Sequence, residues 1–214
     1  MNDMDSKFST WFEQGFDLYK RHFAVLVLAS LIGGALSLVS LGILSGAMIA
    51  GLILIVNRLL NGGEPKPEAG DVLKGFEYFL PMLLFSLVWG IALFLILTIL
   101  HLIPCIGPLL SFPVSFGAQV FLAFAPFLIV ERKMDFWSAS KASVETVRAH
   151  FLPLLGIILV ASILGGLGSL FCGIGLVVTF PLTLCILSVV YRDVFQPRQQ
   201  APRPEMISLE KEHG

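Results

Sequence analysis

The sequence lacks charged residues over most of its length. All 14 Lys and Arg and all 15 Asp and Glu fall in four segments: the stretch to Arg21, Arg58–Glu77, Glu131–Arg148 and the tail from Arg192. The long stretches between them carry no formal charge, and a 214-residue chain has no core large enough to bury them. The sequence therefore predicts an all-α, polytopic membrane protein rather than a soluble domain.

Several kinds of chemistry are excluded by other absences. The sequence has no H-E-x-x-H, no C-x-x-C and no carboxylate pair inside an apolar stretch, so we expect no metal, no cofactor and no catalytic residues. Intramembrane proteases and ion-driven pumps usually carry ionisable groups within their spans, which this chain lacks. The net charge of −1 argues against a nucleic-acid partner.

One short motif has the spacing of an acyltransferase site. Ser138 and Lys141 fit an S-x-x-K pattern, which places a hydroxyl and an amine on one face of a helix. Such enzymes also need Ser-Asp-Asn and Lys-Thr-Gly elements, and neither occurs in this sequence. We interpret the motif as part of a solvated amphipathic helix, and we predict that the protein is not an enzyme.

Three charge-free stretches are each too long for one membrane span of about 20 residues. They are Phe23–Asn57, Phe79–Val130 and Phe151–Tyr191, and Gly and Pro lie near the middle of each. Each stretch therefore predicts a hairpin of two helices. The six predicted spans lie near 23–41, 43–60, 79–103, 108–130, 151–171 and 174–191.

The charges also predict the orientation of these spans. Every Lys and Arg lies on one side of the six-span arrangement, which the positive-inside bias identifies as cytoplasmic. Both termini are then cytoplasmic. Residues 196–214 are polar and contain proline, so we expect a disordered cytoplasmic tail after a single transmembrane domain of residues 1–195.

Short sequence matches suggest a threefold internal repeat. Phe79-Leu80-Pro81 matches Phe151-Leu152-Pro153, and His22-Phe23 matches His150-Phe151. We predict three units near 6–60, 65–130 and 132–191, each an amphipathic cytoplasmic helix followed by a two-span hairpin. Chance similarity between apolar stretches of low diversity is the alternative.

Large aromatic side chains are the expected interfacial anchors of these amphipathic helices. On the first and third helices they are Trp11, Phe12, Phe16, Tyr19, Phe136 and Trp137. An aromatic face opposite mixed charge is typical of a helix lying among lipid headgroups. The same face could instead pack on the cytoplasmic ends of the bundle, and the sequence leaves both alternatives open.

A few polar residues and prolines interrupt the apolar spans. The candidates for intramembrane polar contacts are Gln119, Asn57 and Thr98, and the expected helix kinks are Pro113, Pro126 and Pro181. For Gln119 we expect an interhelical hydrogen bond, with contact to a substrate as the alternative. Prolines that break helices can line transporter cavities, but packing geometry is the interpretation we favour.

Cysteines and small residues leave further alternatives. Cys105 and Cys172 fall at matched outer hairpins, where they could form a disulfide or pack as small apolar residues, whereas we expect Cys185 to be inert. The face Gly42-x-x-x-Gly46-x-x-x-Ala50 permits close helix approach, either within the chain or in a homo-oligomer.

The order of several short motifs resembles a known group of proteins. Ala125-Pro126-Phe127-Leu128-Ile129-Val130 is followed by Asp135-Phe136-Trp137-Ser138-Ala139-Ser140-Lys141-Ala142-Ser143, then by His150-Phe151, Gly173-Ile174-Gly175 and Phe180-Pro181. Over most of residues 8–191 this is similar to bacterial six-span membrane proteins of undefined function. That group is in turn similar to the membrane domain of some glycerophosphodiester phosphodiesterases. The resemblance implies a six-span protein of the bacterial cytoplasmic (inner) membrane. It does not imply the enzyme's activity, because nothing here corresponds to its soluble catalytic domain with acidic metal ligands.

We therefore predict an integral membrane protein without a catalytic site, acting as a scaffold, a lipid-interacting module or a regulator of a partner. Its expected partners are membrane lipid and a cytoplasmic or membrane protein. The alternative is an uncoupled transporter or channel for a small or amphipathic solute, with a cavity near Gln119 and Pro113.

Overall fold

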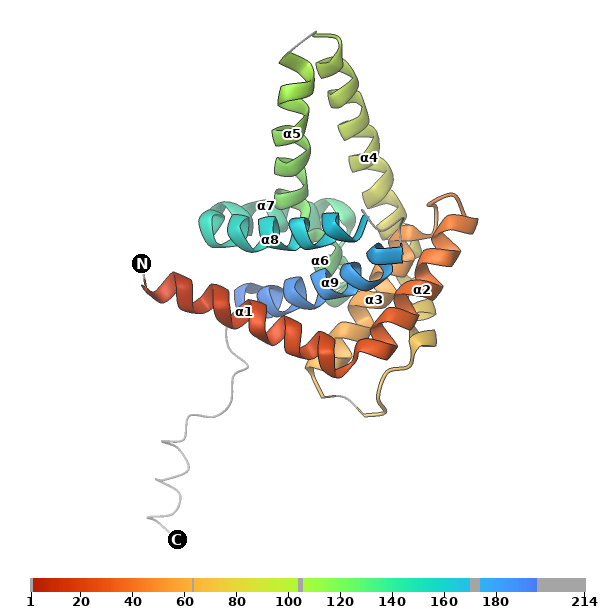
Figure 1. The fold of residues 1–214 in the computed structure, drawn as a ribbon. Helices are drawn as coiled ribbons and strands as arrows, with labels where there is room; N and C mark the ends of the chain where they lie inside the picture. The colour runs from red at the N-terminus through yellow and green to blue at the C-terminus, as the bar shows by residue number, and fades with distance from the viewer. Residues whose placement is uncertain (1, 63, 104–105, 170–173, 196–214) are drawn as a thin grey trace.

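The protein is all-helical, as predicted. A computed structural model describes residues 2–62, 64–103, 106–169 and 174–195, and these ranges contain no strand (Figure 1). The elements in chain order are α1 (Asn2–Arg21), α2 (Phe23–Val39), α3 (Ser45–Leu60), the 3-10 helix η1 (Ala69–Tyr78), α4 (Phe79–His101), α5 (Ile106–Leu122), α6 (Ala125–Arg132), α7 (Phe136–Ala149), α8 (Phe151–Ser169) and α9 (Ile174–Phe195). Cys105, Cys172 and the tail 196–214 lie outside the described residues, so the expectations about a disulfide and a disordered tail are not tested.

Six membrane spans are not confirmed. By length and composition, three stretches among the described residues could cross a membrane: Ala69–His101, Gly107–Arg132 and Gly175–Phe195. The number rises to five if each of two sharply bent helix pairs is counted as one span, and Ser45–Leu60 is apolar but shorter. The predicted apolar segments therefore form helices, but not six helices of spanning length.

Two bends occur where the sequence changes from amphipathic to apolar. α1 and α2 meet at 84° around His22, and α7 and α8 meet at 109° around His150. A charged helix therefore leads into an apolar one at both places. In the middle of the chain η1 continues directly into α4 instead, so the match between the three predicted units is incomplete.

The centre of the protein is α3, whose small residues allow backbones to touch. A Cβ atom added at Gly51 would overlap the carbonyl of Val72, and one added at Gly75 would overlap the carbonyl of Ala47. η1 therefore packs backbone to backbone on α3. Val72 lies beside Gly51, whereas Gly75, which comes later in η1, lies beside Ala47, which comes earlier in α3. η1 therefore runs antiparallel to α3, toward the start of α3.

This close packing places α4 beyond the α2–α3 hairpin. Gly46, at the first turn of α3, lies against Met82 in the first turn of α4, where an added Cβ would be 3.1 Å from the Met82 Cβ. Figure 1 shows the consequence: α4 and α5 project away from a body formed by the other helices. The α2–α3 and α4–α5 hairpins are thus arranged end to end rather than side by side.

α1 packs lengthwise on α9. Trp11 Nε1 donates to the Asp193 carboxylate at 3.1 Å, and Tyr19 Oη donates to the Val178 carbonyl at 2.8 Å. Gly15 lies between these contacts, where an added Cβ would be 2.7 Å from the Ile186 Cα. The first helix is therefore held along the last one, which brings the two ends of the described chain together.

Candidate functional site

The most unusual surface of the protein is the outside of α4. Its sequence from Phe79 to Leu100 contains no charged residue and is apolar on every side. None of the 18-residue apolar window in this stretch is buried inside the protein. The large side chains exposed on α4 are Leu80, Leu84, Leu87, Val88, Ile91, Phe94, Leu95, Ile96 and Ile99. A helix of 23 residues is about 34 Å long, which matches the roughly 30 Å hydrocarbon layer of a bilayer.

The second arm of the projecting hairpin is built from two helices. α5 ends at Leu122 and α6 begins at Ala125, with a turn at Ala123 and Phe124 between them. Pro126 lies in the first turn of α6, so this expected kink is a helix start within the predicted span. Proline has no backbone N–H, and the turn therefore leaves backbone groups without their usual helical partners.

A serine of α7 binds the backbone at this turn. The Ser143 hydroxyl donates to the Phe121 carbonyl at 2.7 Å and accepts from the Phe124 N–H at 3.3 Å. Ser143 is fully buried, the bond from the Phe124 N–H is buried as well, and the bond to the Phe121 carbonyl is partly buried. Ser143, which follows the S-x-x-K motif on the same helix, therefore has a structural role: it joins α7 to the hairpin.

We expect Ser143→Ala to loosen the hairpin. It leaves a buried carbonyl and a buried N–H without their partner, which costs about 1–3 kcal/mol. The measurement is thermal unfolding of the detergent-solubilised protein, followed by helicity. Ser138→Ala is the matched control, because Ser138 bonds to Asp135 at the start of its own helix and not to the hairpin. Equal melting temperatures for the two variants would contradict the assignment.

A second contact joins α7 to α4. Trp89 Nε1 donates to the Ser140 hydroxyl at 2.9 Å, and the Trp89 and Trp137 rings stack with centroids 6.5 Å apart. The Lys141 ammonium lies 5.6 Å from the centre of the Trp137 ring. α7 thus contacts both arms of the hairpin. Its Ser140 binds Trp89 of α4, and its Ser143 binds the α5–α6 turn.

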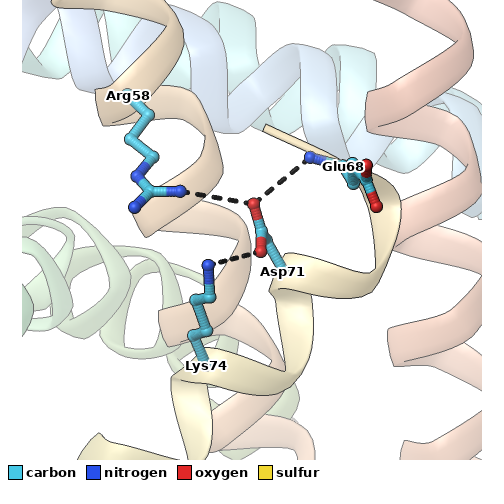
Figure 2. Close-up of polar contacts among 4 residues, drawn as sticks. All are labelled: Arg58, Glu68, Asp71 and Lys74. Atoms are coloured by element: carbon cyan, nitrogen blue, oxygen red, sulfur yellow. Dashed lines mark hydrogen bonds and ion pairs between the residues drawn. The ribbon is translucent and has the colours of Figure 1, made fainter. Parts of the chain in front are cut away.

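Below the hairpin, the charges converge on Asp71 (Figure 2). Its carboxylate accepts from Lys74 Nζ at 2.6 Å, from the Glu68 N–H at 3.2 Å and from Arg58 Nη1 at 3.4 Å. The bond from Lys74 is the main reason that the pKa of Asp71 lies below its ordinary value of 3.8, and the Arg58 charge lowers it further. This cluster fastens the start of η1 to the end of α3.

The lowered pKa predicts a dependence of stability on pH. The ionised Asp71 contributes stability above its ordinary pKa of 3.8, and this contribution is lost as the pH falls through the lower value of the folded protein. Asp71→Asn should therefore reduce the unfolding free energy at neutral pH, by on the order of 1 kcal/mol. The gap to the native protein should close in strong acid. Denaturation at a series of pH values checks this, with Glu145→Gln, on the exposed face of α7, as the control.

A hollow of about 260 Å³ lies at the base of the hairpin. It is lined by Glu77, Tyr78 and Pro81, where η1 passes into α4, and by Ile129, Lys133 and Met134, where α6 ends. Lys133 has a left-handed backbone (φ 51°) and ends α6. One acidic and one basic residue thus line this hollow together with four uncharged ones. Neither residue was singled out from the sequence, because the two come together only when α4 and α6 pack.

The predicted intramembrane polar residues lie apart from this hollow and from one another. Gln119 is exposed on α5, and its Oε1 accepts from Ser162 of α8 at 3.4 Å. Thr98 donates to the Phe94 carbonyl of its own helix at 2.7 Å. Asn57 is 9% exposed, and its side-chain amide has no hydrogen-bond partner among the described atoms.

The remaining expected features are distributed through the body and the hairpin. α5 continues through the exposed Pro113, and α9 continues through the buried Pro181. Cys185 is fully buried. Gly42 lies in the turn after α2, with φ 87°, so it is not part of a helix face.

The aromatic residues expected at the interface divide into two groups. Trp11 and Tyr19 are each only 6% exposed and pack on α9, which is the bundle-packing alternative. Phe12, Phe16 and Phe136 are half-buried, whereas Trp137 is 50% exposed. Trp137 is the most exposed of this set, although its ring stacks on Trp89 and lies under Lys141.

Comparison with known proteins adds no relative. No family model, curated protein or solved structure matches this chain. Within the described ranges, no group of three or more His, Cys, Asp or Glu residues is arranged to hold a metal ion. The candidate site is therefore defined by the hairpin and its polar base alone.

Proposed function

We propose that this chain is an integral protein of the bacterial cytoplasmic membrane that acts by binding, as a scaffold, a lipid-interacting module or a regulator of a partner. The observation that carries the proposal is α4: a helix of spanning length, apolar on all sides, whose apolar window is not buried by the rest of the chain. A helix that is hydrophobic all round needs either a large protein core or hydrocarbon around it. The part of the chain that the structure describes supplies no such core for α4.

The test is physical association with membranes. The protein should remain in the membrane fraction after washing at alkaline pH and should float with liposomes after reconstitution. Extraction by alkaline carbonate, or recovery as a soluble monomer without detergent, would refute the proposal. A protein that exposes this much apolar surface should not remain monomeric in water, because burying apolar surface contributes a favourable free energy of roughly 25 cal/mol per Å².

The proposal includes three related units and six membrane-embedded segments, with both termini in the cytoplasm. It is supported by the start of the first apolar helix of each unit, at Phe23, Phe79 and Phe151. Exposed apolar side chains on α2 and α8, including Leu31 and Leu152, also need hydrocarbon around them. Six crossings require the α2–α3 hairpin to lie at the same depth in the membrane as α4. The chain changes direction sharply at His22, the residue between α1 and α2.

Thiol labelling in intact cells distinguishes six crossings from a single inserted hairpin. The probes are Leu102→Cys after α4, Leu41→Cys after α2 and Glu145→Cys on α7, each in a cysteine-free background. An impermeant reagent should label Leu102→Cys and spare Glu145→Cys in either case. Labelling of Leu41→Cys would support six crossings, whereas its protection would leave α4–α5 as the inserted element.

The absence of enzymatic activity is part of this proposal. Lys141 of the S-x-x-K motif lies over the Trp137 ring, and the neighbouring buried hydroxyls of Ser140 and Ser143 bond to the hairpin, so this part of α7 has a structural use. Purified protein should show no turnover of ester or phosphodiester substrates. Turnover lost in Ser138→Ala would refute this, and solute flux through liposomes that is lost in Gln119→Leu would favour the transporter alternative.

A further inference from the structure

The hollow at the base of the hairpin combines two opposite charges with an apolar wall. Glu77 and Lys133 supply the charges, Tyr78 supplies a hydroxyl, and Pro81 and Ile129 supply apolar surface. These residues lie where the charge-free part of α4 begins and where α6 ends. If the hairpin crosses a bilayer, this is the level of the lipid headgroups.

The two charged side chains of the hollow are available to a ligand. Three other cations of η1, α3 and α6 bond elsewhere, since Arg58 and Lys74 bond to Asp71 and Arg132 donates to the Phe195 carbonyl. Among the described residues, neither Glu77 nor Lys133 has an ion-pair partner. Two opposite charges face one hollow without neutralising each other, which suits a ligand that carries both signs.

We propose that this hollow binds the headgroup of a zwitterionic phospholipid with a primary ammonium, that is, a phosphoethanolamine headgroup. The Lys133 ammonium pairs with the phosphate, and the Glu77 carboxylate accepts hydrogen bonds from the ligand ammonium. Tyr78 lies in the same hollow and can donate to a phosphate oxygen. The inference deepens the proposed function, because it rests on the hairpin being embedded in lipid.

The size of the hollow and its surroundings agree with a lipid. Its volume of about 260 Å³ is below the roughly 300–1,000 Å³ of sites that enclose whole drug-sized ligands, so it can hold a headgroup but not the acyl chains. The chains have a path, because Leu80 is 63% exposed and Leu84 37% exposed on α4, on either side of the pocket residue Pro81 in the sequence. The hollow thus provides a surface for the headgroup, and the exposed leucines of α4 provide one for the acyl chains.

The charges decide between headgroups. An anionic headgroup would pair with Lys133 but would meet repulsion from the Glu77 carboxylate. A choline headgroup carries both signs, but its quaternary ammonium has no N–H to donate to Glu77. The arrangement therefore favours phosphoethanolamine over both, through the hydrogen bonds to a charged acceptor, which are the stronger kind.

The experiment measures retained lipid on the full chain. Protein reconstituted in nanodiscs with equal amounts of phosphatidylethanolamine, phosphatidylcholine and phosphatidylglycerol is released and analysed by native mass spectrometry. The native protein should retain phosphatidylethanolamine preferentially. Lys133→Gly should reduce that retention by about tenfold, the effect of losing a charged hydrogen bond. This variant should fold, because glycine accepts the left-handed backbone at this position.

Three further variants control the interpretation. Lys133→Arg keeps the cation and should keep the lipid, and Glu77→Gln should lose the preference over phosphatidylglycerol. Lys66→Gln, an exposed lysine outside the hollow, should behave as the native protein. Equal retention by native protein and Lys133→Gly, or a native preference for phosphatidylglycerol, would overturn the inference.

Two outcomes separate this inference from the proposed function. Soluble phosphoethanolamine competing as well as the intact lipid would show a site for a free headgroup, not for a membrane lipid. Stable flotation with liposomes without any lipid preference would refute the lipid site and leave the membrane proposal standing. Failure to float would refute both.

Discussion

Replacing Gly51 or Gly75 by alanine should destroy the packing at the centre of the protein. A methyl group at either position would overlap a backbone carbonyl, of Val72 or of Ala47, and a backbone atom cannot rotate away as a side chain can. Overpacking of this kind costs typically 1–3 kcal/mol, and we expect about 3 kcal/mol or more because two backbones must separate. The melting temperature in detergent should fall sharply.

The matched controls are glycines that meet open space. An added Cβ at Gly90 or Gly117 has no heavy atom within 4 Å beyond its own helical backbone, and both lie inside helices. Alanine there should be neutral or stabilising by up to about 1 kcal/mol, because it is the better helix former. If Gly51→Ala melted with Gly90→Ala, the close contact of α3 with η1 would be wrong.

Two arginines in the middle of α4 should prevent the protein from entering a membrane. Ile91 and Phe94 are 52% and 69% exposed near the centre of the helix, where each arginine costs about 2.5–3.5 kcal/mol on insertion scales. Ile91→Arg with Phe94→Arg therefore opposes insertion by roughly 5–7 kcal/mol. The measurement is the fraction of protein that resists carbonate extraction from membranes.

Arginine at a comparably exposed apolar residue before α4 serves as the control. Leu73 is 47% exposed on η1, between the charged residues Asp71 and Lys74, so Leu73→Arg should leave insertion unchanged. If the α4 double variant inserted as well as Leu73→Arg, α4 would not lie in hydrocarbon. If both variants failed, general misfolding would explain the loss, and the double variant would carry no information about α4.

The helical segments could be predicted with useful accuracy. α2, α4 and α8 begin at Phe23, Phe79 and Phe151, the residues with which the predicted spans also begin. This succeeded because the change from charged to charge-free sequence is abrupt, and helix is the main way to satisfy the backbone in a long apolar stretch. Asp135, in the charged segment Glu131–Arg148, caps α7, and its carboxylate accepts from the backbone N–H groups of Trp137 and Ser138.

The arrangement of those helices could not be predicted. The end-to-end placement of the hairpins depends on Gly51 and Gly75, which read in the sequence as ordinary small residues. The burial of only part of the aromatic face of α1 could not be predicted either. Trp11 is buried by Asp193 and the rest of α9, which are distant from it in the chain. The contact of Trp11 with Asp193 joins residues 182 positions apart and leaves no local periodic signal.

Composition and the distribution of charge by themselves determined that the protein is helical, that several of its segments are apolar enough to span a membrane, and where α2, α4 and α8 begin. These properties are local, because each follows from the free energy of placing a residue in water or in hydrocarbon. Only the tertiary structure decided that α4 and α5 project from the body, that Ser143 joins α7 to the α5–α6 turn, and that Glu77 and Lys133 share one hollow. These depend on which surfaces fit closely enough to touch, and that shape complementarity exists only after the chain has folded.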